Sequence, residues 1–287
     1  MNDKKTALLG LFDGLHRGHM SAVRELLRCQ GEKLVYTFNS LSVVTKGARG
    51  LLTTDGEKRE MLKSSGVDRV ISKDFSEVRN ISPGEFVRNI LRDELGVTKA
   101  ICGENFRFGK GGAAGADELS ELCRECGIGT VIVPTVYDGG LPVSTTRIRE
   151  HIERGEISEA NRLLGRCYGF CGEIAHGFRI GSSMGIKTLN IAFPPERVMP
   201  KKGVYASRVR LAGSELAGIT NIGTRPTVHE GGEVVIETHL LDFTEDIYGE
   251  RAEVLLTEFM REEKRFGSLD ELRGTVANDI EKRREMI

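Results

Sequence analysis

The first half of the chain alternates between two kinds of apolar spacing, and this alternation limits the folds available to it. Short apolar runs, typical of buried strands, occur at 7–12, 34–38, 67–71, 99–102 and 130–133. Segments with helical spacing separate them, at 17–28, 57–62, 83–95 and 117–126. Strands that alternate with helices form parallel sheets, because each helix returns the chain to the start of the next strand. We therefore predict a parallel sheet with helices on both faces.

The pattern changes near residue 150. Two helical stretches follow each other between 145 and 164, and after them come short strand-like runs separated by turns rich in Gly and Pro. Ser268-Leu269-Asp270-Glu271 is a capping box that starts a final helix. The sequence thus predicts an α/β Rossmann-like domain with a parallel sheet over 1–150 and a helical linker over 151–167. A small antiparallel β-barrel with a terminal helix is predicted over 168–287.

Composition excludes several classes of protein. The chain has 41 basic and 42 acidic residues and is 39% hydrophobic, which excludes a disordered chain and one that holds nucleic acid by bulk charge. No apolar run approaches the roughly 20 residues that span a bilayer, and no signal peptide is evident. We expect a cytoplasmic protein with no nucleic-acid or membrane partner. Its six cysteines are then expected as thiols, although the pairs Cys123/Cys126 and Cys167/Cys171 leave a structural zinc site as an alternative.

Residues 10–19, Gly-Leu-Phe-Asp-Gly-Leu-His-Arg-Gly-His, lie between the first predicted strand and the first predicted helix. Free backbone N–H groups at a helix N-terminus favour an anion, and His16 and His19 there can face one phosphate. Gly14 and Gly18 allow the backbone to approach a ligand closely. The alternative is an ordinary strand-to-helix turn that carries two exposed histidines.

This segment resembles the signature of the HxGH nucleotidyltransferases, which transfer a nucleotide from ATP or CTP and release pyrophosphate. The second motif of that family resembles Val143-Ser144-Thr145-Thr146-Arg147-Ile148-Arg149. The resemblance implies that His16 and His19 contact the ATP phosphates as catalytic residues. The ATP-binding residues that it implies in this half are Gly10, Phe12, Asp13, Gly14, Gly18, Ser144, Thr145, Thr146 and Arg149.

Residues 103–109, Gly-Glu-Asn-Phe-Arg-Phe-Gly, follow a predicted strand. They resemble a segment of the flavin-handling branch of the same superfamily, which implies that Asn105, Phe106 and Phe108 bind a flavin. An amide with nearby aromatic rings suits a flavin ring. The alternative is a loop that ends in glycine and contributes two phenylalanines to the core.

The second half resembles riboflavin kinase over nearly its whole length. The matching segments are 176–177, Gly181, 185–190, 221–227, 237–243, 246–249 and 261–266. The resemblance implies that Thr188 and Asn190 offer oxygen ligands to Mg²⁺, and that Glu237 is the general base for the ribityl hydroxyl. It also places Gly181 and Gly185 at the ATP phosphates. Alternatively, Thr188 and Asn190 are ordinary strand residues and Glu237 is a solvated carboxylate.

Taken together, the two halves resemble the bacterial bifunctional riboflavin kinase/FAD synthetase family. The implied reactions are phosphorylation of riboflavin to FMN by ATP and adenylylation of FMN to FAD, both with Mg²⁺. Three departures from the family pattern are Lys187, Ser182 and the segment 39–42, which lacks two prolines. They leave open a protein with one working half, or a flavin-binding protein without turnover. The oligomeric state is also left open.

Overall fold

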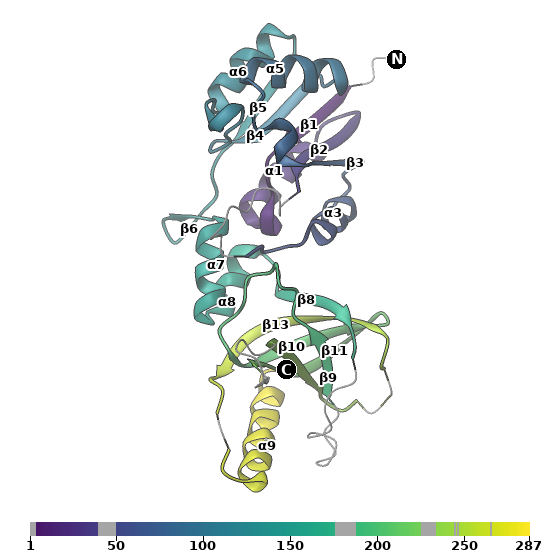
Figure 1. Cartoon of the computed structure of the whole chain (residues 1–287), viewed down its shortest axis with the longest axis vertical. Coiled ribbons are helices and arrows are strands. Elements are labelled where there is room, and N and C mark those ends of the chain that lie inside the picture. The colour runs from purple at the N-terminus through teal and green to yellow at the C-terminus, as the bar shows by residue number, and fades with distance from the viewer. Residues whose placement is uncertain are drawn as a thin grey trace. The chain divides into compact units, whose positions relative to one another are not determined.

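The structure is a computed structural model that describes residues 4–39, 50–175, 188–224, 234–243, 245, 247–264 and 266–287. The chain divides into two compact units, Met1–Arg147 and Ile148–Ile287 (Figure 1). The division falls inside helix α7 (Thr145–Arg154), so the segment 151–167 that was predicted as a linker lies within the second unit.

The first unit contains a five-stranded sheet among its described residues, in the order β3-β2-β1-β4-β5. Every neighbouring pair is parallel, which confirms the predicted parallel α/β arrangement. The first strand ends earlier than predicted, because the chain turns after Leu9. The strands are β1 (Lys5–Leu9), β2 (Glu32–Phe38), β3 (Arg69–Lys73), β4 (Lys99–Gly103) and β5 (Gly129–Val133).

Both faces of this sheet are covered. On β1, Ala7 and Leu9 belong to one apolar core and Leu8 to the other. The first core contains side chains of η2 and α6, and the second contains side chains of α1 and α3. Burial on both faces explains why the strands read as continuous apolar runs. The larger helices are α1 (Arg17–Leu27), α3 (Asp55–Ser64), α5 (Pro83–Glu85) with the π-helix η2 (Phe86–Glu94), and α6 (Ala116–Glu125).

Shorter elements complete the first unit. They are η1 (Asp13–Leu15), α4 (Phe75–Val78), η3 (Lys110–Gly112) and the hairpin of β6 (Tyr137–Asp138) and β7 (Leu141–Pro142).

The second unit is built on a six-stranded antiparallel sheet among its described residues, in the order β8-β13-β10-β11-β12-β9. The sheet curls (Figure 1), and an isolated bridge joins Ala175, just after one edge strand, to Asn190 on the other. The antiparallel sheet and the terminal helix α9 (Leu269–Glu285) were both predicted. The strands are β8 (Tyr168–Glu173), β9 (Thr188–Ala192), β10 (Gly203–Leu211), β11 (Ser214–Thr224), β12 (Val234–Leu240) and β13 (Arg251–Arg261), preceded by α8 (Ile157–Leu164).

Polar contacts hold α9 against this sheet and continue into its interior. The buried Arg283 donates to the carbonyl oxygens of Ser207 at 3.1 Å and Gly218 at 3.2 Å. Burial lowers the pKa of Arg283, and the nearby Arg208 lowers it further. The hydroxyls of Ser207, Thr220 and Thr238 are also buried and form a hydrogen-bonded chain with both links at 2.8 Å.

Candidate active sites

A strained turn connects β1 to α1. Phe12 and Leu15 have φ values of +54° and +39°, and Gly14 has +80°. Only glycine adopts this region at low cost, so the conformations of Phe12 and Leu15 must be held by their surroundings. Both side chains are buried in the core that α1 covers. The turn is therefore fixed by packing at the place where the predicted nucleotide-binding motif lies.

His16 is the N-cap of α1. Its Nδ1 accepts a hydrogen bond from the backbone N–H of His19 at 3.3 Å, so in the neutral ring the proton is on Nε2. The two imidazoles stack with centroids 3.6 Å apart and planes 17° apart. A Cβ at Gly18 would lie 3.1 Å from two atoms of the His16 ring. The structure thus brings both predicted histidines together, and the small residue between them leaves room for the ring.

A cavity of about 530 Å³ opens beside the histidines, within the usual size range of small-molecule sites. Its walls come from the turn after β1, the loop after β4, the end of β5 and the start of α7. The described residues Asp13, Gly14, Phe108 and Arg149 do not line it. The predicted residues that do line it are Gly10, Phe12, His16, Gly18, His19, Asn105, Phe106, Ser144, Thr145 and Thr146.

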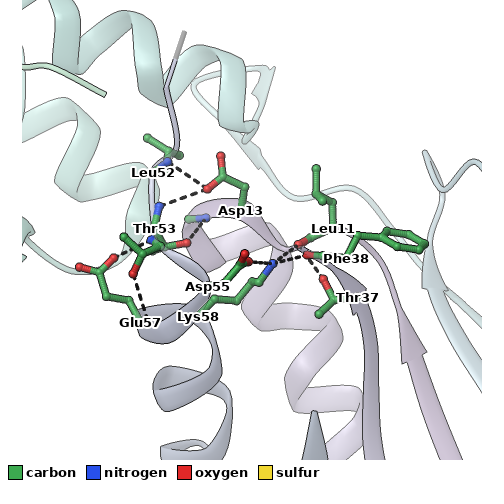
Figure 2. Close-up of polar contacts among 11 residues, drawn as sticks. Leu11, Asp13, Thr37, Phe38, Leu52, Thr53, Asp55, Glu57 and Lys58 are labelled. Carbon is green, nitrogen blue, oxygen red and sulfur yellow. Dashed lines mark hydrogen bonds and ion pairs between the residues drawn. The ribbon is translucent and has the colours of Figure 1, made fainter. Parts of the chain in front are cut away.

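Asp13 does not line the cavity, although the resemblance implied a place among the ATP-binding residues. Its buried carboxylate accepts hydrogen bonds from the backbone N–H groups of Leu52 at 2.9 Å and Thr53 at 3.1 Å. The backbone N–H of Gly14 donates to the Thr53 hydroxyl at 3.0 Å. Figure 2 shows these contacts, which join the strained turn to the segment that precedes α3.

Lys58 on α3 is a residue of this region that the sequence reasoning missed. Its side chain is buried, and its Nζ donates to the carbonyl oxygen of Phe38 at 2.8 Å and to that of Leu11 at 3.4 Å (Figure 2). Nζ also lies 2.9 Å from the carboxylate of Asp55. The sequence contained one indication that Lys58 is buried. It lies four residues before the buried Leu62, and residues at this spacing lie on the same side of a helix.

The segment 103–109 divides its side chains between the cavity and the core. The Asn105 amide donates to the Thr135 hydroxyl at 3.3 Å. The carboxylate of Glu104 accepts from the Thr135 backbone N–H at 2.8 Å, which lowers the pKa of Glu104. Phe106 stacks on Phe108 with centroids 5.6 Å apart. Phe108 is 7% exposed and belongs to the core, but it also lines a second cavity of about 80 Å³ that shares Phe106 with the first.

The hairpin of β6 and β7 was not predicted. Arg17, next to His16, forms an ion pair with Asp138 at 2.7 Å, and Arg147 donates to the Asp138 carbonyl oxygen at 2.9 Å. Gly139 and Gly140 form the connection, and both have positive φ. Two such residues between short strands are the usual signal of a tight hairpin, and this signal could have revealed it.

In the second unit, strand register brings predicted site residues together. Glu237 on β12 pairs with Asn190 on β9 and, on its other side, with Asn221 on β11. Because directly paired residues project from the same face of a sheet, these three side chains share one face. Thr188 lies two residues from Asn190 on that face and lines a cavity of about 70 Å³. Gly181, Ser182, Gly185, Lys187 and residues 40–42 lie outside the described residues.

The six cysteines are free thiols. Within the described ranges, no group of three or more His, Cys, Asp or Glu side chains is placed to hold a metal ion. No helix in the described part of the chain has the length and apolar character needed to cross a membrane.

Comparison with known proteins covers both units. Residues 1–147 match the family model of FAD synthetases, and residues 164–287 match that of riboflavin kinases. The bifunctional riboflavin kinase/FMN adenylyltransferase of Pseudomonas fluorescens is 34% identical over 289 residues, covering 96% of this chain and 90% of the relative. The protein of the same description from Escherichia coli K12 is 34% identical over 281 residues, covering 94% and 89%. A crystal structure described as a macrolide-efflux protein from Streptococcus pneumoniae is similar with a TM-score of 0.88, at 27% identity, over 99% of this chain and 95% of that one.

Proposed function

The chain belongs to the bifunctional riboflavin kinase/FMN adenylyltransferase family, and we propose how its own residues carry out the two reactions. Its second half is a riboflavin kinase that makes FMN, and its first half adenylylates FMN to FAD. The family resemblance drawn from the motifs is thereby confirmed. The observation that carries the assignment is the match of both family models, in order, to the two halves of the chain.

In the first unit, ATP occupies the cavity of about 530 Å³ with its phosphates at the start of α1. An oxygen of the FMN phosphate attacks the α-phosphorus of ATP, the bond from that phosphorus to the bridging oxygen breaks, and pyrophosphate leaves. The stacked rings of His16 and His19 stabilise the charge that develops on the phosphates. Support for this placement comes from Thr145, whose hydroxyl lies 3.4 Å from the Asp13 carbonyl oxygen and brings the second motif to the turn. Ser144 and Thr146 line the same cavity and are proposed to complete the phosphate contacts, whereas the phosphate contact of Arg149 stays a prediction from the resemblance.

The flavin ring of FMN is held at the aromatic side of the same cavity. Phe106 and Asn105 line the wall, and Phe38 and Phe75 lie at the junction with the smaller cavity of about 80 Å³. Phe108 supports Phe106 from the core side by ring stacking. The role of Phe108 is therefore indirect, and Asn105 and Phe106 are the residues proposed to touch the ring.

In the second unit, Glu237 takes the proton of the ribityl 5′-hydroxyl, whose oxygen attacks the γ-phosphorus of ATP while ADP leaves. The neutral side-chain oxygens of Thr188 and Asn190 fit Mg²⁺, which prefers oxygen ligands, and Asn190 is only 6% exposed beside the Glu237 strand. When bound, the ion would screen the charge of the ATP phosphates. Gly181 and Gly185 are proposed to lie against those phosphates.

Two finer features of the fold belong to the same proposal. We infer that the parallel sheet of the first unit is of the Rossmann-like kind, since β1 lies at its centre with β2 and β4 on either side. We also infer that the curled sheet closes into a barrel. The bridge between Ala175 and Asn190 supports closure, as does Gly172, where a Cβ would lie 2.4 Å from Ile191 of the opposite edge strand.

The test is to incubate the purified protein with ATP and Mg²⁺, with riboflavin in one tube and FMN in another, and to separate the flavins by chromatography. FAD from both tubes is expected. FMN as the sole product from riboflavin would confine activity to the second unit, and FAD from FMN alone would confine it to the first. Flavin that stays unchanged but bound would contradict the proposal and favour a flavin-binding protein.

A further inference from the structure

One lysine of the first unit is buried. Lys58 is 1% exposed, whereas Lys63 on another side of α3 is exposed to solvent. A buried ammonium is costly unless its protons are donated to acceptors. The acceptors here are two main-chain carbonyl oxygens, of Phe38 and Leu11, and the carboxylate of Asp55 (Figure 2).

The two carbonyl groups come from neighbouring segments that both line the large cavity. Leu11 belongs to the strained turn that carries the histidines, and Phe38 ends β2 on the aromatic side. The Thr37 hydroxyl also donates to the Leu11 carbonyl oxygen, at 2.9 Å. A single ammonium group therefore fixes the nucleotide side of the cavity relative to the flavin side.

The start of α3 holds the same turn at a second point. Thr54 and Glu57 form a complete capping box, which fixes the first turn of the helix. Just before it, Thr53 bonds to Gly14, and the backbone of Leu52 and Thr53 bonds to Asp13. The positive φ values of Phe12 and Leu15 need such external support. Helix α3 thus contacts the turn at Leu11, and the segment just before the helix contacts it at Asp13 and Gly14.

We propose that Lys58 is a positioning residue for adenylyl transfer, which sets the distance between the ATP side and the FMN side of the cavity. It touches neither substrate and acts through the carbonyl groups of Leu11 and Phe38. The inference rests on the proposed function of the first unit. In-line attack depends on the separation of the two reactants, and an error of about 1 Å costs roughly 100-fold in rate. Loss of Lys58 should therefore lower kcat far more than it weakens ATP binding.

The test compares Lys58→Met, which keeps an unbranched side chain one atom shorter and without its charge, with Lys63→Met on the exposed side of the same helix. For Lys58→Met we expect kcat of FAD formation from FMN to fall at least 10-fold, with the Kd of ATP changed less than 3-fold. Riboflavin phosphorylation by the same protein should stay within 2-fold of wild type, as an internal control. Lys63→Met should match wild type in both reactions.

Full FAD formation by Lys58→Met would overturn the proposal, as would a loss of ATP binding in proportion to the loss of rate. If Lys58→Met does not fold, the comparison is made with Lys58→Arg, which keeps the charge but changes the geometry, and a wild-type kcat there overturns it. Absence of FAD from the wild-type protein would refute the proposed function instead.

Hydrogen exchange then tests the positioning role of Lys58 independently of activity. The amides of Gly14, Leu52 and Thr53 should exchange faster in the Lys58 variant than in the wild-type protein, while those of β4 stay unchanged. Equal exchange would overturn the proposal.

Discussion

At the scale of single residues, His16 combines two roles that can be separated by mutation. Its ring faces the cavity, and its Nδ1 caps α1. We expect His16→Ala to lower the free energy of unfolding by about 1 kcal/mol through loss of the cap, and to lower FAD formation as well. His16→Asn should restore stability, because asparagine is a good N-cap, but not activity. Urea unfolding and FAD assays on both variants test this; equal stability of Ala and Asn variants would contradict the capping role.

Tyr36 on β2 makes the free energy of unfolding of the first unit depend on pH in the alkaline range. Burial raises its pKa to about 12, with smaller contributions from Glu94 and Glu77, and its hydroxyl has no hydrogen-bond partner among the described residues. Below pH 10 the hydroxyl is protonated in both states and has no effect. Between pH 10 and the folded-state value near 12 only the unfolded state ionises, so the free energy of unfolding falls by about 1.4 kcal/mol per pH unit.

Tyr36→Phe should remove that part of the slope. We expect its unfolding free energy at pH 7 to be no lower than that of wild type, since no described partner loses a hydrogen bond. The measurement is urea unfolding followed by circular dichroism at several pH values from 7 to 12. Cys102, whose pKa burial raises to about 12, leaves a residual slope in the variant. An unchanged slope would show that Tyr36 ionises similarly in both states.

At the scale of elements, the first turn of α1 needs a residue without a side chain. A Cβ at Gly18 would lie 3.1 Å from the His16 ring, so Gly18→Ala must displace that ring by a few tenths of an ångström. Alanine is the better helix former by about 1 kcal/mol, so stability should not fall. We expect FAD formation to fall about 10-fold or more while the melting temperature is kept. Gly56→Ala is the matched control, because its Cβ would find the nearest neighbouring atom at 3.9 Å; the prediction fails if both variants have the same rate.

Periodicity predicted the larger elements well, because burial imposes it. The strands of the parallel sheet are buried on both faces, and their apolar runs carry that information directly. The helix start at Ser82 was also predictable, since a capping box of Ser82 and Glu85 occurs there together with Pro83 at the first helical position. Strand register in the second unit was not, because Asn190 and Glu237 become neighbours only through pairing of β9 with β12.

Site residues were predictable where a motif fixed them and not where tertiary contacts did. The pairing of His16 with His19 follows from their spacing at the start of a helix. By contrast, the carboxylate of Asp13 lies within the same motif yet bonds to Leu52 and Thr53, 39 and 40 residues away. Lys58 carries a charge that indicates a surface position, and its burial is explained by tertiary contacts with the carbonyl groups of Leu11 and Phe38, which lie 47 and 20 residues away in the sequence.

At the scale of the whole molecule, each unit matches a different family model, so the two reactions should be separable. Glu237→Gln is expected to lower FMN formation by about 100-fold or more and leave FAD formation from FMN unchanged. His19→Ala is expected to do the reverse. A mixture of the two variants, given riboflavin and ATP, should make FAD after a lag, because FMN from one protein can reach the other. Accumulation of FMN without FAD would contradict this independence; the time course is followed by chromatography.

The chain of hydrogen-bonded hydroxyls inside the curled sheet limits which substitutions this sequence can accept during evolution. A Cβ at Gly218 would lie within 3.1 Å of the Ser207 hydroxyl, of Thr238 and of a main-chain oxygen, and Thr220 connects the two hydroxyls. Four positions on three adjacent strands thus share one fixed volume and one set of hydrogen bonds. A larger residue at one position requires a smaller one opposite, and an apolar residue in the chain leaves a hydroxyl without a partner. Among descendants of this sequence, substitutions at 207, 218, 220 and 238 should therefore be accepted in concert and seldom singly.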